Sequence, residues 1–279
     1  WYNSAQCWEV SELKVSYYPG CTLRTKAKDL DFYARACAEK LGATLCEVPD
    51  WQCCGGVFVT AKDEIASKLS SVRALAAAAA AGQPLVTVCS ACHNVIKQTN
   101  HAMQNDAEFA AKVNAYLAQD KSPIAYHGET QVLHYLELLR DEIGFDRIRE
   151  AVVHPLTGRK IGAYYGCLLL RPGTVMAMDD VENPQIIEDF LRALGAEPVI
   201  YARRNECCGG YVALDDPAAA HKKGAAVAQN AAELGAEAIV TACPLCKYNL
   251  VKAGSPVPVI YFTELLAEAL GVKEDFHAE

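Results

Sequence analysis

The sequence predicts an α/β protein made of two similar halves, each with its own parallel sheet. Three observations support this: strand-like and helix-like segments alternate, one cysteine pattern occurs twice, and 279 residues give room for two ordinary domains. We expect a first domain over residues 12–156 and a second over residues 157–275. The boundary is placed there because His-Pro and Thr-Gly interrupt the periodicity near residues 154–159.

The first half begins with an alternating strand over residues 14–18, which leads through Pro-Gly to the first cysteine of the pattern. A helix over residues 26–41 ends at a glycine, a common helix C-cap. A strand over residues 44–48 precedes the paired cysteines, and the alanine-rich residues 62–81 have high helix propensity. The apolar run 85–88 indicates a buried strand that ends at the next cysteine.

The second half repeats this order. A strand over residues 161–165 leads into Gly-Cys, and a helix over residues 184–194 ends at a glycine. A strand over residues 198–201 precedes the second pair of cysteines. A helix over residues 218–234 and a strand over residues 238–241 then lead into the last cysteine motif.

Each half is expected to close with a helix, over residues 132–140 and residues 262–270, and residues 100–121 give the first half an additional helical stretch. Strands that alternate with helices imply parallel sheets with right-handed crossovers. We therefore predict two similar Rossmann-like domains related by a pseudo-twofold duplication. In such sheets the loops after the strands gather in one crevice.

Ten of the thirteen cysteines form the repeated pattern, which reads as a lone cysteine, then Cys-Cys-Gly-Gly, then Cys-x-x-Cys. The first copy consists of Cys21, Cys53, Cys54, Cys89 and Cys92. The second copy consists of Cys167, Cys207, Cys208, Cys243 and Cys246. In both copies the Cys-x-x-Cys motif begins 36 positions after the first cysteine of the pair. All six motifs follow expected strands, so each set of five should converge, and soft thiolate sets favour iron–sulfur clusters or zinc.

Five thiolates exceed the four ligands of a tetrahedral structural zinc ion, whereas a cluster of several irons can use all five. The glycines that follow each pair, Gly55-Gly56 and Gly209-Gly210, permit left-handed backbone close to a cofactor. They would also aim peptide N–H groups at the sulfurs. The residues leave three alternatives open: structural zinc in both halves, disulfides, and inert buried thiols.

Several other residues that could bind metal or charge lie outside the pattern. The cysteines expected to be buried or incidental are Cys7, Cys37 and Cys46. The histidines expected to have packing or surface roles, rather than roles as ligands or proton donors, are His93, His127 and His134. Four arginines lie close to the cysteines in the sequence: Arg24, Arg171, Arg203 and Arg204. They could offset thiolate charge or hold an acidic substrate, and a solvated or salt-bridged role is the alternative.

Composition argues against several classes of partner. The net charge is −8, and the charges are interspersed without a long basic run, so we expect no nucleic-acid partner. The apolar stretches are too short to span a bilayer, so we expect no direct membrane insertion. Residues 1–10 lack the features of a secretory signal. Thirteen cysteines without such a signal favour metal ligation in a reducing compartment, the cytoplasm.

The repeated Cys…Cys-Cys-Gly…Cys-x-x-Cys array resembles the cysteine-rich CCG domain family. This family includes the catalytic B subunit of heterodisulfide reductase and subunits of lactate, glycerol-3-phosphate and succinate oxidising complexes. The segments most similar to that catalytic protein are residues 163–172 (AYYGCLLLRP), 180–184 (DVENP) and 194–198 (LGAEP). The resemblance extends from about residue 14 to residue 270.

The resemblance implies two non-cubane 4Fe–4S clusters, each held by the five cysteines of one copy. It also implies an oxidoreductase that reduces or forms a disulfide bound between the clusters. Electrons would come from an iron–sulfur subunit of C type, often fed by a flavin subunit of A type. The complex would be cytoplasmic, either free or docked at the cytoplasmic face of a membrane complex.

The first motif reads Cys-Cys-Gly-Gly where methanogen heterodisulfide reductases have a nearby proline, so another disulfide, a thiol or a quinone is an alternative substrate. Two further functions stay open. One is an electron-relay protein that links a dehydrogenase to a quinone or another carrier. The other is a zinc-stabilised scaffold.

Overall fold

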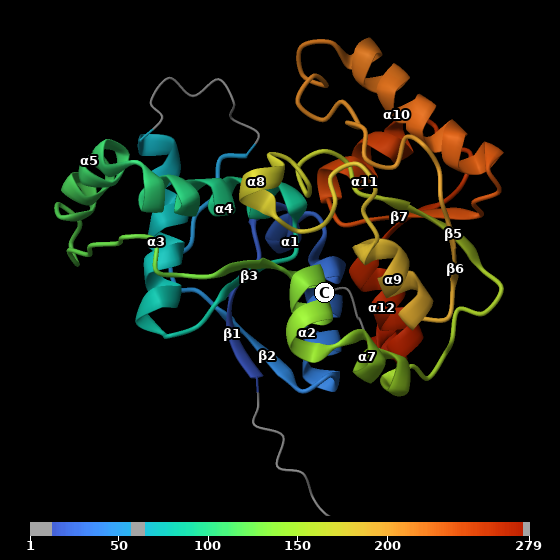
Figure 1. Ribbon diagram of the computed structural model, residues 1–279, viewed down its shortest axis with the longest axis horizontal. Coiled ribbons are helices and arrows are strands. Elements are labelled where there is room, and N and C mark those ends of the chain that lie inside the picture. Colours follow the sequence, from blue (N-terminus) through green and yellow to red (C-terminus); the bar gives the residue numbers. More distant parts are fainter. Residues whose placement is uncertain (1–12, 57–64, 276–279) are drawn as a thin grey trace, which may run out of the picture.

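The computed structural model describes residues 13–56 and 65–275, which form two four-stranded parallel sheets (Figure 1). The strands of the first sheet are β1 (Leu13–Tyr18), β2 (Ala43–Glu47), β3 (Leu85–Thr87) and β4 (Val132–His134). Those of the second sheet are β5 (Lys160–Tyr164), β6 (Glu197–Val199), β7 (Ala238–Thr241) and β8 (Val259–Tyr261). The strand orders are β2-β1-β3-β4 and β6-β5-β7-β8, so the second half repeats the first strand for strand. The predicted duplicated α/β fold is confirmed.

Helices cross between the strands of both halves. The first half contains α1 (Cys21–Thr25), α2 (Lys28–Lys40), α3 (Ala66–Ala80), α4 (Ser90–Asn105), α5 (Ala107–Leu117), α6 (Tyr135–Glu137), the π-helix η1 (Leu138–Ile143) and α7 (Phe145–Ala151). The second half contains α8 (Gly173–Met176), α9 (Ile186–Ala193), α10 (Pro217–Glu233), α11 (Pro244–Lys252), α12 (Phe262–Leu270) and the 3₁₀ helix η2 (Lys273–Asp275). Among the described residues, no helix is long and apolar enough to cross a membrane.

The prediction of a helix over residues 132–140 is wrong at its start, because Val132–His134 is the fourth strand of the first sheet. This short apolar strand continues into a helix without a turn residue, so its sequence reads as one helical segment. The ring of His134 accepts the backbone N–H of Leu136 at 3.2 Å and thereby caps the helix start. The equivalent strand Val259–Tyr261 also joins its helix directly and was not expected.

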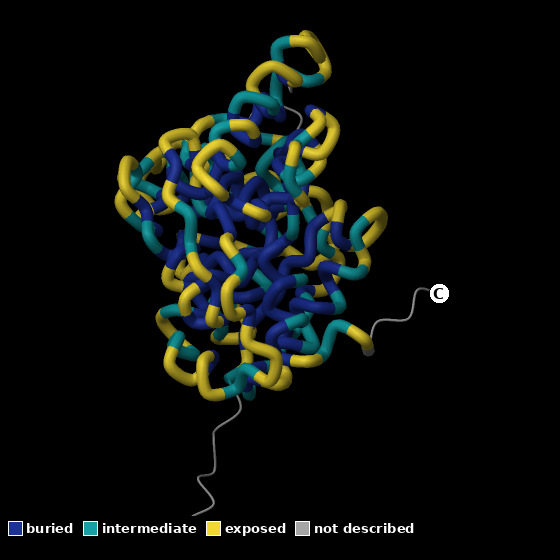
Figure 2. The backbone as a smooth tube through the Cα atoms, turned by 90° about the vertical axis from the view of Figure 1, so that its right-hand side faces the viewer, coloured by how far each residue is buried: buried dark blue, intermediate teal, exposed yellow. Residues whose placement is uncertain are grey.

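The two halves interlock through the helices that follow their fourth strands. Helix α12 of the second half packs against α2 of the first half, and α6 of the first half contacts α9 of the second. Thr263 Oγ1 donates to the carbonyl of Leu30 at 3.3 Å, and Lys40 Nζ donates to the carbonyl of Leu270. One apolar core consequently spans both halves, visible in Figure 2 as a central mass of buried backbone.

Candidate metal centre

The cysteines of the repeated pattern lie at or just beyond the carboxyl ends of β1, β2 and β3 in the first half and of β5, β6 and β7 in the second. This position follows from the parallel sheets, because the loops after parallel strands meet at one sheet edge. The twelve cysteines in the described residues are free thiols.

The first five cysteine side chains contact one another in series. Cys53 Sγ lies 3.6 Å from Cys21 Sγ, and Cys54 Sγ lies 3.5 Å from Cys92 Sγ. Cys53 and Cys54 also shift each other's pKa, as do Cys89 and Cys92, so these thiols are close neighbours. The structure therefore brings together the whole first set, although its members span more than seventy residues of chain.

The second set repeats the same series. Cys167 and Cys207 shift each other's pKa, as do Cys207 and Cys208, Cys208 and Cys246, and Cys246 and Cys243, so these thiols are close neighbours. Cys89 and Cys243 also shift each other's pKa across the junction of the halves, so the ten thiols adjoin one another in a series that runs from Cys21 to Cys167. We call this arrangement the thiol row. It crosses from one half to the other at its midpoint.

Within residues 13–56 and 65–275, no group of three or more His, Cys, Asp or Glu side chains is arranged so that it could hold a metal ion. The sulfurs are arranged as a row rather than as a four-ligand cage. The donor set is five soft sulfurs in each half, and this composition fits iron–sulfur chemistry better than oxygen-ligated metals.

The glycine before each lone cysteine leaves space for a sulfur. A Cβ atom at Gly20 would lie 2.9 Å from Cys92 Sγ, and a Cβ atom at Gly166 would lie 3.1 Å from Cys246 Sγ. Both glycines also have positive φ, +79° and +65°. Each half thus has a close approach between backbone and sulfur that only glycine permits.

Peptide and amide N–H groups point at the paired cysteines. The N–H of Gly209 donates to Cys207 Sγ at 3.3 Å, and Asn249 Nδ2 donates to Cys208 Sγ at 3.6 Å. In the first half the N–H groups of Gly55 and Gly56 bond the paired thiols. These donors stabilise negative charge on sulfur, as a cluster-bound thiolate requires.

Close spacing moves the pKa values of neighbouring thiols in opposite directions. Its neighbours Cys53 and Cys92 lower the pKa of Cys54 to about 3, while Cys54 raises the pKa of Cys53. Cys167 and Cys208 lower the pKa of Cys207 to about 2, while Cys207 raises the pKa of Cys167. Such separation is expected for closely spaced groups that share protons.

Two tyrosines that sequence analysis missed hold the loops of the paired cysteines. The hydroxyl of Tyr18 donates to the carbonyl of Gln52 at 2.5 Å, and that of Tyr164 donates to the carbonyl of Glu206 at 2.7 Å. Each tyrosine ends its strand three residues before the lone cysteine, and each acceptor directly precedes a cysteine pair. The signal was present in the sequence as Tyr-x-Gly-Cys in both copies.

The interface between the halves is held beside Cys89 and Cys243. Ser90 Oγ donates to the carbonyl of Ala242 at 2.7 Å, and the hydroxyl of Tyr261 donates to the carbonyls of Val88 at 2.7 Å and Ala242 at 3.0 Å. All of these groups are buried. The centre of the thiol row therefore lies in a fixed hydrogen-bonded junction.

Two cavities border the row. One, of about 610 Å³, is lined by Cys54, Gly56 and Asn94 of the first half and by Leu168 and Tyr211 of the second. A smaller one lies among the second set of cysteines and is also lined by Leu168 and Tyr211. Burial raises the pKa of Tyr211, and thiols of both sets raise it further. Tyr211 thus lines both cavities, one beside Cys54 and the other beside the second set.

Of the three histidines considered in the sequence analysis, one is exposed and two are buried. His127 is exposed, and burial lowers the pKa of His134 to about 3. His134 Nε2 lies 3.1 Å from the carbonyl of Val88. His93 is buried with both ring nitrogens lacking a hydrogen-bond partner, although its Nε2 lies 3.4 Å from Glu137 Oε2.

The predicted arginines form ion pairs within the protein. Their partners are Glu47 for Arg24 at 3.8 Å, Glu182 for Arg171 at 3.0 Å, Glu206 for Arg203 at 2.7 Å and Glu188 for Arg204 at 3.2 Å. Of the remaining cysteines, Cys37 is buried in α2 and Cys46 is half-buried in β2. Cys7 lies outside the described residues.

Comparison with known proteins agrees with this geometry. The model of the CCG cysteine-rich domain family matches residues 15–97 and residues 161–251. The chain is 29% identical over 269 residues to the 8-methylmenaquinol:fumarate reductase membrane anchor subunit of Wolinella succinogenes, with 93% of each chain covered. It is 28% identical over 281 residues to the B subunit of the ferredoxin/F(420)H(2)-dependent CoB-CoM heterodisulfide reductase of Methanosarcina acetivorans, with 94% of this chain and 91% of the relative covered.

A third similarity concerns the fold alone. The crystal structure of a hypothetical protein from Helicobacter pylori superposes with a TM-score of 0.71 at 14% sequence identity. The alignment covers 92% of this chain and 49% of that protein, so the chain spans about half of its length.

Proposed function

Because the chain belongs to the CCG family of cysteine-rich domains, we propose that it is the iron–sulfur catalytic subunit of a heterodisulfide-reductase-like complex. In this proposal each set of five cysteines holds one non-cubane 4Fe–4S cluster. The reaction is the reduction, or in reverse the formation, of a disulfide between the two sets. The two CCG domains would be residues 12–156 and 157–275.

The observation that carries the proposal is the thiol row, which crosses the interface between the halves at Cys89 and Cys243. The cavity of about 610 Å³ opens beside it and has walls from both halves. A small molecule in this cavity would approach Cys54 on one side and Tyr211 on the other. The smaller cavity among the second set shares Leu168 and Tyr211 with it, so a substrate held across both could place its two sulfur atoms near two separate redox centres.

The walls of this cavity are held rigidly across the interface. Asn94 Nδ2, on α4, donates to the carbonyls of Leu168 at 2.8 Å and Arg171 at 2.7 Å in the loop that follows Cys167. A fixed cavity reduces the entropic cost of orienting a substrate. Asn94 therefore acts as a positioning residue for the second-half loop.

The clusters would supply electrons one at a time, and the protein would position the substrate and tune the clusters. Cleavage of one disulfide takes two electrons and two protons and yields two thiols. The electrons would come from an iron–sulfur partner subunit of C type, with a flavin subunit of A type behind it. The complex would act in the cytoplasm, either free or docked on a membrane complex.

A second candidate is an electron-relay protein that connects a dehydrogenase to a quinone. The name of the Wolinella succinogenes relative, part of an 8-methylmenaquinol:fumarate reductase, favours this candidate. Both candidates require the same two iron–sulfur centres, and they differ in the molecule that exchanges electrons with the protein.

Anaerobic purification followed by metal analysis and EPR tests the proposal. We expect about eight irons per chain and little zinc, and EPR signals that change when a disulfide is added. Zinc in place of iron would support a scaffold and contradict both redox candidates. Iron-loaded protein whose EPR signals respond to a quinone, but to none of the disulfides tested, would favour the relay.

A further inference from the structure

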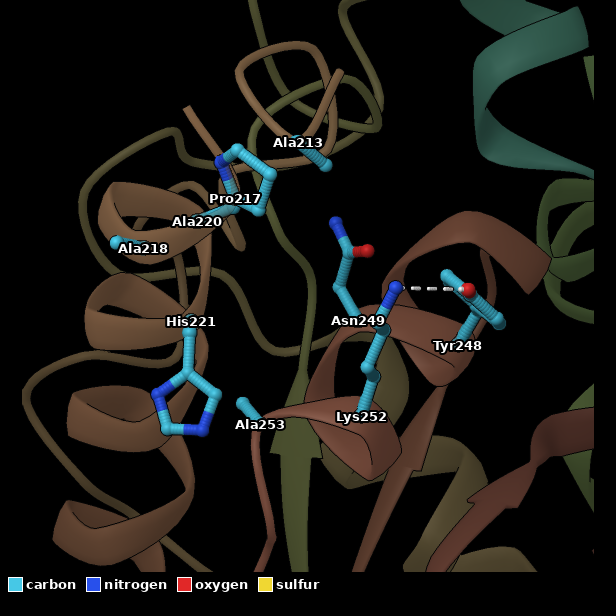
Figure 3. Close-up of a pocket in the computed structure, with 9 residues that line it drawn as sticks. All are labelled: Ala213, Pro217, Ala218, Ala220, His221, Tyr248, Asn249, Lys252 and Ala253. Carbon is cyan, nitrogen blue, oxygen red and sulfur yellow. Dashed lines mark hydrogen bonds between the residues drawn. The ribbon is translucent and has the colours of Figure 1, made fainter. Parts of the chain in front are cut away.

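A pocket of about 340 Å³ opens between α10 and α11, outside the junction of the two halves (Figure 3). Its walls are mostly apolar and consist of four alanines and Pro217. Four polar side chains join them: His221 projects from α10, and Tyr248, Asn249 and Lys252 project from α11 (Figure 3). Apolar walls with a few polar groups are typical of small-molecule sites.

Asn249 connects this pocket to the thiol row. Its side chain lines the pocket, and its Nδ2 donates to Cys208 Sγ at 3.6 Å. Asn249 itself is buried. A molecule in the pocket would therefore be separated from a cysteine of the second set by a single side chain.

The pocket is enclosed by close packing of the surrounding backbone. A Cβ atom at Gly209 would lie 2.8 Å from Ala220 Cα, so the start of α10 packs directly on the loop of the paired cysteines. A Cβ atom at Gly224 would lie 2.9 Å from Ala253 Cβ, which brings α10 and α11 together one turn beyond His221. Helix α10, which forms one wall of the pocket, therefore rests on the glycine-rich loop that holds Cys207 and Cys208.

The pocket is open to solvent beside α11. Tyr248, which lines it, is 57% exposed. Lys252 Nζ lies 3.3 Å from the Tyr248 hydroxyl and 5.5 Å from the centre of its ring. An exposed aromatic ring beside apolar walls suits a flat, apolar ligand that stacks on it.

The polar groups favour a ligand with hydrogen-bond acceptors rather than an anion bound at the helix end. The carboxylate of Asp216 already caps α10 by accepting the N–H of Ala219 at 2.9 Å. His221 and Lys252 supply donors on opposite helices. Carbonyl oxygens on a flat, apolar ring match these donors and walls.

We propose that this pocket binds the ring of a quinone or quinol, with its apolar tail leaving through the open side of the pocket. The redox part of this proposal rests on the iron–sulfur centre proposed above for the second cysteine set. Reduction of a bound quinone would take two electrons from that centre, one at a time, and two protons from water at the open rim. The product is the quinol, and quinol oxidation is the reverse.

Photolabelling locates the site without relying on turnover. Anaerobically purified full-length protein would be illuminated with an azido-1,4-naphthoquinone, and labelled peptides would be mapped by mass spectrometry. We expect the label in residues 213–221 and 248–253. Ala218→Phe, which fills the pocket from an exposed wall position, should reduce labelling at least tenfold.

Gln229→Phe is the matched control, because it places the same ring on an exposed position three turns further along α10. It should leave labelling unchanged. If Ala218→Phe fails to fold, His221→Leu should still weaken labelling severalfold, because leucine has no hydrogen-bond donor to replace the imidazole. Labelling elsewhere, equal labelling of Ala218→Phe, or labelling only at millimolar probe would overturn the proposal.

EPR of the same samples separates this proposal from the one above. Labelling of the expected peptides would support the pocket. A quinone-induced change in the EPR signal that is absent from Cys208→Ser would support its connection to the second centre. Iron-free protein would overturn the iron–sulfur function, while the labelling would still decide whether the pocket binds a quinone. Iron-loaded protein that responds to disulfides but is not labelled here would overturn the quinone site alone.

Discussion

Gly20→Ala is expected to disable the first cysteine set while leaving the second intact. Gly20 precedes α1 with φ +79° and ψ +161°, a region that is essentially restricted to glycine. The added methyl group would lie 2.9 Å from Cys92 Sγ, so the sulfur would have to move. Cys92 sits in the first turn of α4, where the helix limits that movement.

The size of the effect follows from two contributions. The backbone conformation costs about 1–3 kcal/mol for a non-glycine residue, and overpacking against the sulfur costs about 1–3 kcal/mol more. Gly144→Ala is the matched control. Gly144 also precedes a helix, with φ +89° and ψ +134°, but a Cβ atom there meets nothing within 4 Å. It should therefore incur only the backbone cost.

Urea unfolding and iron analysis measure the two consequences. Gly20→Ala should be less stable than Gly144→Ala by about 1–3 kcal/mol and should lose about half of its iron. The EPR signal of the second cluster should persist. Gly20→Ala protein with full iron content, and no less stable than Gly144→Ala, would refute the reasoning about the space around Cys92.

Three further predictions concern the cysteines, the loop anchors and pH. Cys54→Ser and Cys208→Ser should each reduce iron from about eight to about four atoms per chain; complete loss from either variant would mean that the two halves load as one unit. Tyr164→Phe leaves the carbonyl of Glu206 without its partner and should destabilise the protein by about 1–3 kcal/mol, whereas Tyr116→Phe, at an exposed position, should change stability little in the same urea titration. Burial raises the pKa of Glu137. The neutral carboxyl therefore makes its full contribution to the free energy of unfolding below about pH 4.3. That contribution is lost as pH rises through the raised pKa. Glu137→Gln should remove this loss between pH 4 and 8, and an unchanged pH dependence of the urea midpoint would contradict the assignment.

The sequence predicted the parts of the fold that carry strong local signals. The strand over residues 238–241 agrees with the structure at both ends, and the helix over residues 262–270 does also. The fourth strands, Val132–His134 and Val259–Tyr261, were missed because three residues are too few to show alternation. Their place in the sheets is decided by pairing with β3 and β7, which is a tertiary effect.

For the candidate site, the cysteine spacing predicted the convergence of each set of five, because parallel strands end at one edge. The proximity of Cys89 to Cys243 could not be predicted from the sequence around either residue, because it depends on how the two halves pack. The pocket beside Asn249 was also invisible, since it is formed by the approach of α10 to α11. Whether the cysteines hold iron stays a prediction that metal analysis must test.

The exchange of covering helices between the halves has a consequence for biosynthesis. Helix α2 emerges from the ribosome early, but the surface it packs against belongs to α12, which is translated near the end of the described chain. At about 5–20 residues per second, the first half would wait many seconds with that apolar face uncovered. Delivery of the iron proposed for the first cysteine set should therefore follow synthesis of the second half, and nascent chains that stall before residue 262 should depend on chaperones.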